Sequence, residues 1–600
     1  MKKRLIYVLF CGLITTGMVG CGSGNNSGSD TDSDSYNEYV VKASKDSLVQ
    51  YTSGMTVNND SEASDAGTAV VEDTDADDIE GRGMRFDYED VTEQFSPEAI
   101  HIIDNVDGNI FSKSSEDAVN NMTVSISTVP EKYDSRDVSG KAYVTPARDQ
   151  GYTYLCWSYA AIGAIEADLL KHHTDLSADT INLSEKHLAY YNMHKASGSK
   201  NGLIDEDYRE LVNAMNEQNA WIFDYDTGYV SVGGVTDYVA SVLTAWKGPV
   251  NESGSDAFTT LYGMEAVFTD NKDLPSSAYK ADYHVQGVYE IPATKDNLDE
   301  VKQLIMEHGA VTCSVNSSSA YWNNSFKDMY DYNEYGEGNL ADHEVLIVGW
   351  DDEYPASNFG VTPPGDGAFI ARNSWGQMYG ENGFCYISYY DNIVTNNNIA
   401  AYDVVTPSES DYYDNNYQVD GFITYTVSAL EDKLNLVYAE SDNSNPYGVL
   451  YNVEDGNETV RAVGIWSLET NTSYEIRIYK NPEVQNGKIS FDSLGNPDAI
   501  QTAAAATGGF HTFALDTEVD VDVDDTFLCL VIPMQDGKLV YEKAMNKTGE
   551  SNYDEWNHLT GNIHTQNTAS GKSYYLNKDG DGLEVQTDRD FSVKVYTDNR

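Results

Sequence analysis

The sequence predicts an α+β domain, with a helical lobe and an antiparallel β lobe, followed by an all-β sandwich domain. Apolar residues recur at helical spacing after residue 156, and strand-like apolar runs are spread over residues 310–390. After residue 407 the pattern changes to short alternating strands separated by Asn, Asp and Gly turns, which is typical of a β-sandwich. The 600 residues, 40% of them apolar, are enough for about two to four domains with buried cores.

The overall charge excludes several classes of partner. The chain has 37 Lys and Arg residues against 97 Asp and Glu residues, so its net charge is −60. A surface this acidic repels phosphate groups, which excludes nucleic-acid binding and adsorption to an anionic membrane surface. Six cysteines in 600 residues are too few for a disulfide scaffold.

The N-terminus has the parts of a bacterial export signal. Positive residues at 2–4 precede an apolar stretch at 5–19, which is followed by Gly20 and Cys21. The residues Met18-Val19-Gly20-Cys21 resemble a lipobox, in which Cys21 is diacylated and becomes the new N-terminus. We therefore predict a signal peptide at 1–20 and an extracytoplasmic protein anchored to the bacterial cell membrane through Cys21. An ordinary cleaved signal with a chance cysteine is the alternative.

Two segments separate the signal from the first periodic element. Residues 22–80 carry 14 acidic and 2 basic side chains and almost no periodic apolar pattern, so they cannot bury enough surface to fold alone. We predict an acidic flexible linker over residues 21–83. Short apolar runs return over residues 84–130, which form either a candidate pro-segment or additional packing.

The first strong helical pattern begins at Cys156. Small and apolar side chains recur at helical spacing at Trp157, Ala160, Ala161, Ala164, Ile165 and Leu169. The pattern places Cys156 at a helix N-terminus, where the unpaired amides and the helix dipole favour a thiolate over a thiol. Taken alone, however, a cysteine on an apolar helix is more often an inert core residue.

Strand-like runs follow a second helical pattern that ends at Gly309. The runs are Ala310–Val315, Val345–Trp350, Ala368–Ala371 and Phe384–Tyr390. His343 lies just before the second run, and Asn373 lies just after the third. A helical half followed by antiparallel strands is the basis of the α+β prediction.

Five blocks along the chain resemble, in order, the motifs of the papain-like cysteine peptidases. The blocks are Gln150-Gly151 with Cys156–Ala160, Asn182–Glu185, Gly233-Gly234, Asp342–Trp350, and Asn373–Gly376 with Gly380–Phe384. Five blocks in the right order make a chance resemblance very improbable. The resemblance implies a two-lobed papain-like catalytic domain over residues 131–404, working without a cofactor and without a metal.

The resemblance assigns catalytic roles to four residues. Cys156 is the nucleophile, and an imidazolium at His343 together with the helix N-terminus lowers the pKa of its thiol, as in papain. The side-chain oxygen of Asn373 orients the imidazole, and Gln150 donates to the oxyanion together with the Cys156 amide. Each residue also has an ordinary interpretation: His343 as one of eleven histidines, Asn373 as a turn cap and Gln150 as a surface amide.

Three further residues are assigned to substrate binding by the same resemblance. Gly233 and Gly234 correspond to the glycines of the substrate wall, although two glycines alone indicate only a turn. Trp375 corresponds to the indole that shields the His–Asn hydrogen bond from water.

The chain also departs from the family pattern. Residues 152–155 replace the usual disulfide cysteine and glycine, and Tyr154 and Leu155 are expected to crowd the cleft. Glu344 stands where a small residue usually follows the histidine, and its carboxylate could alter the imidazole charge unless strand alternation points it away. Tyr379 occupies the position where the family usually has a second Trp.

The C-terminal region, 405–600, resembles the lectin-like module found behind the peptidase in bacterial relatives, which is a fold-level analogy. Within it, Asn577–Gly582 with Asp588 mimics a calcium loop, but the flanking residues fit the two arms of a β-hairpin better. Cys313, Cys385 and Cys529 each lie in an apolar run and are predicted to be buried free thiols.

Together these features predict a secreted or surface-anchored cysteine endopeptidase that hydrolyses protein or peptide substrates. Its expected partners are those substrates, the membrane through Cys21, and a cell-wall or glycan ligand for the C-terminal domain. One alternative is a catalytically inactive surface binding protein that keeps the peptidase fold, which Tyr154, Leu155 and Glu344 would explain. Acyl transfer to amines is a second alternative, which Gln150 and Asn373 disfavour.

Overall fold

The computed structural model describes most of the chain after residue 128. The described residues are 129–151, 153–193, 234, 236–258, 275–276, 280–323, 325–335, 341–420, 437–440, 445–453, 456–534, 539–543 and 570–600. The predicted signal peptide at 1–20, Cys21 with the linker at 21–83, most of the segment 84–130, Tyr152 and Gly233 lie outside them.

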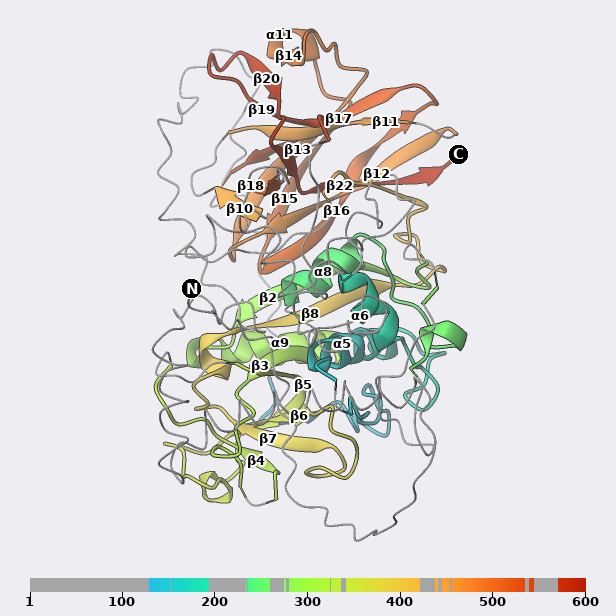
Figure 1. Ribbon diagram of the computed structural model, residues 1–600. Coiled ribbons are helices and arrows are strands. Elements are labelled where there is room, and N and C mark those ends of the chain that lie inside the picture. The colour runs from blue at the N-terminus through green and yellow to red at the C-terminus, as the bar shows by residue number, and fades with distance from the viewer. Residues whose placement is uncertain are drawn as a thin grey trace, which may run out of the picture.

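The helical lobe is built around the predicted helix at Cys156. The α-helices of the first domain in the described part of the chain are α5 Cys156–His172, α6 Glu185–Met193, α8 Thr236–Thr244 and α9 Leu298–His308, of which α9 packs in the core on the other face of the sheet from α5. Helix α5 is buried on all sides, with 15 of its 17 residues buried, so it lies inside the domain with other elements around it (Figure 1). Gly309 ends α9 with φ +81°, and its amide donates to the Ile305 carbonyl at 2.8 Å, so the predicted helix end is confirmed.

The β lobe belongs to one long, mostly antiparallel sheet. Its order is β4-β7-β6-β5-β3-β8-β2-β16-β12-β22-β9, with β1 pairing beside β3 along β5. The strands are β1 Lys132–Asp134, β2 His284–Pro292, β3 Val311–Val315, β4 Asp328–Met329, β5 His343–Asp351, β6 Ala368–Arg372, β7 Phe384–Ser388, β8 Asn398–Val405, β9 Asn415–Tyr417, β12 Glu458–Ser467, β16 Gly508–Val521 and β22 Val593–Asn599. The four predicted strands correspond to β3, β5, β6 and β7.

Alternation along β5 sends its side chains into two different cores. Leu346 and Val348 pack in the core that contains α5, whereas Val345 and Ile347 pack in the core on the other face of the sheet. Because His343 and Val345 share a face, and Glu344 and Leu346 share the other, the two first residues of β5 point to opposite sides of the sheet.

Strand β1 ties the beginning of the described chain to the end of β5. Lys132–Asp134 pair with Gly349–Asp351, and the indole nitrogen of Trp350 donates to the Pro130 carbonyl at 3.0 Å. A Cβ on Gly349 would lie 2.3 Å from the Tyr133 carbonyl oxygen, so this close approach of two strands requires glycine.

The C-terminal region is a β-sandwich, as predicted. Its second sheet has the order β14-β20-β19-β11-β17-β13-β15, and a smaller sheet has the order β10-β18-β21. The strands are β10 Val437–Glu440, β11 Tyr447–Asn452, β13 Thr472–Lys480, β14 Lys488–Ser490, β15 Ala499–Ala505, β17 Thr526–Pro533, β18 Leu539–Lys543, β19 Ser573–Leu576, β20 Gly582–Val585 and β21 Arg589–Phe591, with a short helix α11 Phe491–Leu494. Strands β19 and β20 pair as a hairpin around Asn577, which confirms the hairpin prediction there.

The long sheet runs without interruption from the first domain into the second. Strand β2 of the first domain pairs with β16 of the second, where Val288 faces Phe510. Trp466, Leu468 and Phe510 of the C-terminal domain belong to the same buried core as helix α5. The two domains, stacked in Figure 1, are therefore joined by main-chain hydrogen bonds and a shared apolar core.

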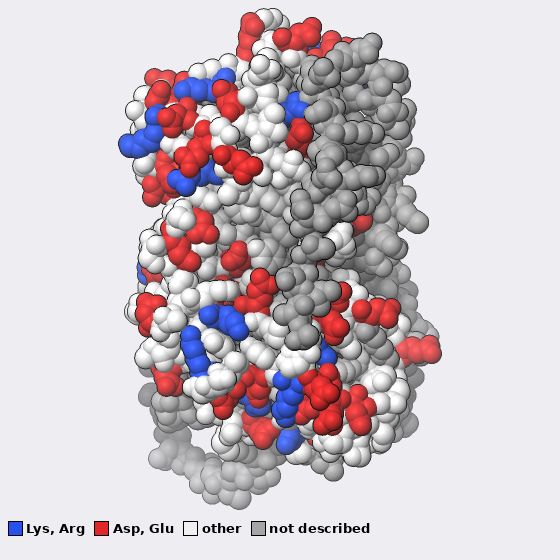
Figure 2. Space-filling view, turned by 180° about the vertical axis from the view of Figure 1, so that it is seen from behind, with Lys and Arg blue, Asp and Glu red and all other residues white. Residues whose placement is uncertain are grey.

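The surface and the thiols agree with the composition. Acidic side chains are spread over both domains on the face shown in Figure 2. Cys313, Cys385 and Cys529 are buried and free, as predicted, and burial raises the pKa of the Cys385 thiol to about 12. Within the described residues, no helix is long and apolar enough to cross a membrane.

Candidate active site

Cys156 is the first residue of α5, and its side chain is buried. The segment just before it is bonded to the segment that follows Asn373. The Gln150 amide donates to the Ser374 carbonyl at 2.8 Å, and the Gly376 amide donates to the Arg148 carbonyl at 2.9 Å. These bonds bring the Gln150 turn and the asparagine block together at the start of α5.

His343 is the first residue of β5 and is held by two neighbours. Its Nε2 lies 2.8 Å from Oδ1 of Asn373, and its ring stacks on the indole of Trp375 with 4.8 Å between ring centroids. Burial lowers the pKa of His343 to about 4, although the Asn373 bond opposes this. Among the described residues no hydrogen-bond partner is found for Nδ1, so Nδ1 is the ring nitrogen left to exchange a proton with a thiol.

Asn373 directly follows β6 and is itself fixed by its surroundings. Its Oδ1 also accepts a hydrogen bond from the Ser374 amide at 2.7 Å, and its own amide donates to the Gly383 carbonyl at 2.9 Å. An oxygen with two lone pairs can accept both bonds, so the side chain presents its oxygen, not its nitrogen, to the imidazole. The side chain is thus in the orientation that the resemblance expects.

Gln150 is fully buried, unlike the surface amide considered above. Its Oε1 accepts from the Ser374 hydroxyl at 2.6 Å, and its Nε2 donates to the Thr153 carbonyl at 2.7 Å. A carboxamide nitrogen carries two hydrogens, so one remains for a further acceptor. The two bonds hold the carboxamide in one orientation.

The remaining predicted substrate residues can be placed only in part. Gly234 is buried against Trp157, the neighbour of Cys156, and a Cβ there would lie 2.6 Å from the indole. This position therefore requires glycine, whereas Gly233 lies outside the described residues. Tyr154 and Leu155 are both buried.

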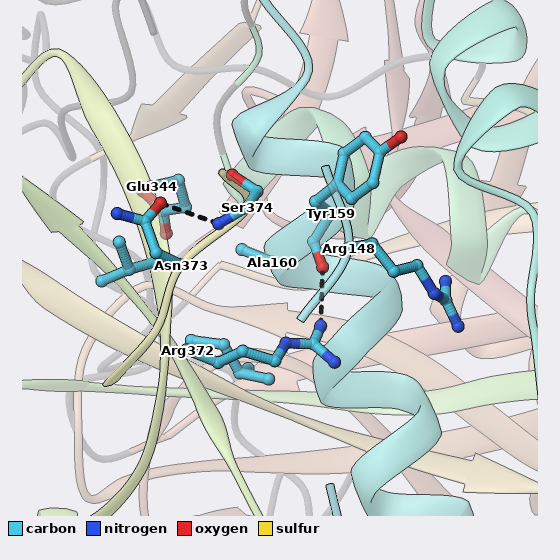
Figure 3. Close-up of a pocket in the computed structure, with 9 residues that line it drawn as sticks. Arg148, Tyr159, Ala160, Glu344, Arg372, Asn373 and Ser374 are labelled. Carbon is cyan, nitrogen blue, oxygen red and sulfur yellow. Dashed lines mark hydrogen bonds between the residues drawn. The ribbon is translucent and has the colours of Figure 1, made fainter. Parts of the chain in front are cut away.

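Glu344 points to the opposite side of β5 from His343. Its carboxyl accepts a hydrogen bond from the Ser314 hydroxyl at 2.7 Å and lines a cavity of about 10 Å³, enough for about one water. Asn373 and Ser374 line the same cavity, with Arg148 on its other side (Figure 3). Burial raises the pKa of Glu344 to about 8, so the group is mostly uncharged at neutral pH. Alternation thus removes the expected conflict with the imidazole.

A buried charge network below the site was not predicted. Arg148 forms ion pairs of 2.5 Å with both Glu166 and Glu185, and it holds a pKa well above its usual range despite burial. Arg372 donates to the Thr145 hydroxyl at 2.5 Å. Only Glu185 lay in a motif block, and residues this far apart in sequence leave no local pattern that could have revealed the network.

Comparisons with known proteins agree with this geometry. Residues 129–406 match the family described as papain family cysteine protease, and residues 436–597 match the lectin-like domain family. A cysteine protease of Blomia tropicalis is 24% identical over 281 residues, covering 46% of this chain and 66% of that protein. Procathepsin L of Felis catus is 24% identical over 257 residues, covering 43% of this chain and 60% of that protein. The chain thus spans less than two thirds of the length of these curated relatives.

A solved structure resembles both domains together. The cysteine protease and lectin-like domains of Cwp84, a surface layer associated protein of Clostridium difficile, align with a TM-score of 0.56 at 22% identity, covering 78% of this chain and 89% of that one. A structure of Cwp84 after propeptide cleavage aligns with a TM-score of 0.55 at 21% identity, covering 76% of this chain and 97% of that one. The chain therefore has a papain-like fold followed by a lectin-like β fold, over the residues that match these two family models.

Proposed function

We propose that this protein is a cysteine endopeptidase that uses Cys156, His343, Asn373 and Gln150. The observation that carries the proposal is the bond of 2.8 Å between His343 Nε2 and Asn373 Oδ1 under the indole of Trp375. This bond orients the ring and leaves Nδ1 for the thiol. An inactive binding protein would have no need to keep that arrangement.

The reaction follows from these positions. His343 Nδ1 accepts the thiol proton, and the Cys156 sulfur attacks the carbonyl carbon of the scissile peptide bond. The remaining N–H of Gln150 and the Cys156 amide stabilise the oxyanion. The imidazolium then gives its proton to the leaving amine, and the C–N bond breaks to leave a thioester on Cys156. Water, deprotonated by His343, attacks this thioester, which releases the acid and restores the thiol.

The test is covalent labelling of reduced protein by an epoxysuccinyl peptide. We expect one label, on Cys156, and loss of hydrolysis of a denatured protein substrate. Cys313, Cys385 and Cys529 serve as internal controls, because burial raises the pKa of each of these thiols and should keep them unlabelled in the folded protein. The Cys156→Ser variant should take no label. Absence of labelling in reduced, folded wild-type protein would favour the inactive binding protein.

We further propose that the protein acts outside the cytoplasm, anchored to the bacterial cell membrane or surface through Cys21. Support comes from the lipobox-like sequence at Met18–Cys21 and from the surface-layer association of Cwp84. In this proposal residues 1–20 are the signal peptide, 21–83 the tether and 84–130 a pro-segment, ahead of a catalytic domain at 131–404. The domain at 405–600 would hold a cell-wall or glycan ligand, for which its match to the lectin-like family is the support.

A further inference from the structure

Helix α8 connects the candidate substrate wall to the lectin-like domain. Two residues before its first turn, Gly234 lies against Trp157, the neighbour of Cys156. At its other end the chain turns into the junction between the two domains, where Figure 1 shows α8 directly below the sandwich. A nine-residue helix is about 13 Å long and behaves as a stiff rod over that distance.

The C-terminal end of α8 has an unusual residue in its cap. The Trp246 amide donates to the Leu243 carbonyl at 2.9 Å, and the Lys247 amide donates to the Val242 carbonyl at 3.1 Å, which is the pattern of a Schellman cap. The left-handed position in this cap usually belongs to glycine, yet here Trp246 occupies it with φ +62°. Contacts of the indole must therefore offset the backbone strain.

Those contacts reach the second domain. The Trp246 indole stacks on His284 of β2 with 3.7 Å between ring centroids, and on Tyr596 of β22 with 5.5 Å. Tyr596 is fully buried in the lectin-like domain. The end of α8 is thus fixed by a ring of the second domain.

Side chains from the end of strand β9 and the residue after it satisfy the last carbonyl group of α8 and the next one along the chain. The side-chain amide of Asn416 donates to the Thr244 carbonyl at 3.0 Å, and that of Gln418 donates to the Ala245 carbonyl at 3.3 Å. Carbonyls at a helix end have no partner within the helix, so such bonds stabilise it. Because β9 pairs with β22, these bonds also attach α8 to the sandwich.

The buried face of α8 belongs to a core that both domains share. Val239, Ala240 and Leu243 lie in the same apolar cluster as Trp466 and Phe510 of the lectin-like domain. Close-packed cores transmit displacement, because they leave no free space to absorb it.

We infer that the lectin-like domain positions the substrate wall at Gly234 through helix α8, and so acts as a structural part of the peptidase site. This inference rests on the proposed peptidase function. It predicts that loosening the junction impairs the binding of peptides and leaves the reactivity of the Cys156 thiol unchanged.

The test compares two sets of variants in the segment 415–418, at the end of β9. Asn416→Ala combined with Gln418→Ala removes both bonds to α8. Asn415→Ala is the matched control, since the Asn415 side chain bonds only to Thr597 and Asn599 within the sandwich sheet. A second variant, Trp246→Gly, removes the stacked ring and keeps the residue that a Schellman cap prefers, so the helix end should still form.

Two measurements on reduced full-length protein read out the effect. Hydrogen exchange of the α8 amides should rise about fivefold for each bond lost in the double variant and should not change in Asn415→Ala. The rate of labelling by an epoxysuccinyl peptide should fall about fivefold or more in the double variant and in Trp246→Gly, with the rate for a small haloacetamide unchanged.

The outcomes separate this inference from the proposed function. Faster exchange in α8 with an unchanged ratio of the two labelling rates would overturn the link to the substrate wall. Unchanged exchange in the double variant would overturn the attachment itself. Failure of both reagents to label the wild type would instead contradict the proposed function, and the exchange data would still test the attachment.

Discussion

The buried carboxyl of Glu344 should make the stability of the protein depend on pH in a way that one substitution removes. Its pKa is raised from 4.5 to about 8, first by burial, against the opposing bond from Ser314. Folded protein therefore holds a proton that the unfolded chain releases above about pH 4.5. Unfolding becomes more favourable as pH rises from about 4.5 to about 8, and this contribution is constant above that range. Glu344→Gln keeps the shape of the side chain and cannot ionise.

The size of the effect follows from the same values. Each pH unit between the two pKa values corresponds to about 1.4 kcal/mol, so the full interval of about 3.5 units corresponds to about 5 kcal/mol. Between pH 5.0 and pH 7.5, wild-type protein should lose about 3 kcal/mol of unfolding free energy through this group. Glu344→Gln should lack this loss, so its advantage over wild type should grow with pH.

The assay is guanidinium unfolding of wild type and variants at pH 5.0 and pH 7.5. Contributions from all other titrating groups are common to both proteins and cancel in the comparison. The control is Glu353→Gln, an exposed carboxylate just beyond the same strand, which should follow wild type at both pH values. An identical pH dependence for wild type and Glu344→Gln would refute the reasoning.

Two further predictions concern the proposed chemistry and location. Asn373→Ala removes a hydrogen bond to the imidazolium that is worth about 1.5–3 kcal/mol. In a profile of Cys156 alkylation rate by a small haloacetamide against pH, the plateau rate should therefore fall by about tenfold or more. Gln150→Ala should keep the wild-type alkylation profile while kcat falls by about 10²–10³; equal profiles for both variants would remove Asn373 from the orienting role. Cys21→Ser should move the protein from the membrane fraction to the medium with unchanged specific activity, and unchanged retention would contradict the lipid anchor.

Much of the site could be located from sequence because each part carries a local signal. The start of a helical pattern marks Cys156, and an apolar run beginning at Val345 marks His343 as the residue before a central strand. Strand alternation also indicated that Glu344 could point away from the imidazole, and in the structure its side chain does so. The environment of Gln150 could not be predicted, because a buried amide and an exposed one look alike in sequence.

The junction between the domains left no signal of its own. Strand β2 includes Gln286 and Glu290 among its apolar residues, so it shows no clean apolar run. Gly508 and Gly509 at the start of β16 indicate a turn more readily than a strand partner. Alternation reports which face of a strand is buried, but it carries no information on which distant strand will pair with it.

The contacts of strand β1 limit where the proposed pro-segment could be cut. The Asp352 amide donates to the Glu131 carbonyl at 2.9 Å, next to the bond between Trp350 and Pro130. A protease that cut after Pro130 would leave a charged terminus where these bonds now hold β1, and it would uncover the indole of Trp350. If part of the segment 84–130 is removed on activation, as proposed above, the scissile bond therefore belongs before Pro130 and not at the proposed boundary after it. The mature chain should then begin with a few residues whose role is to complete the sheet.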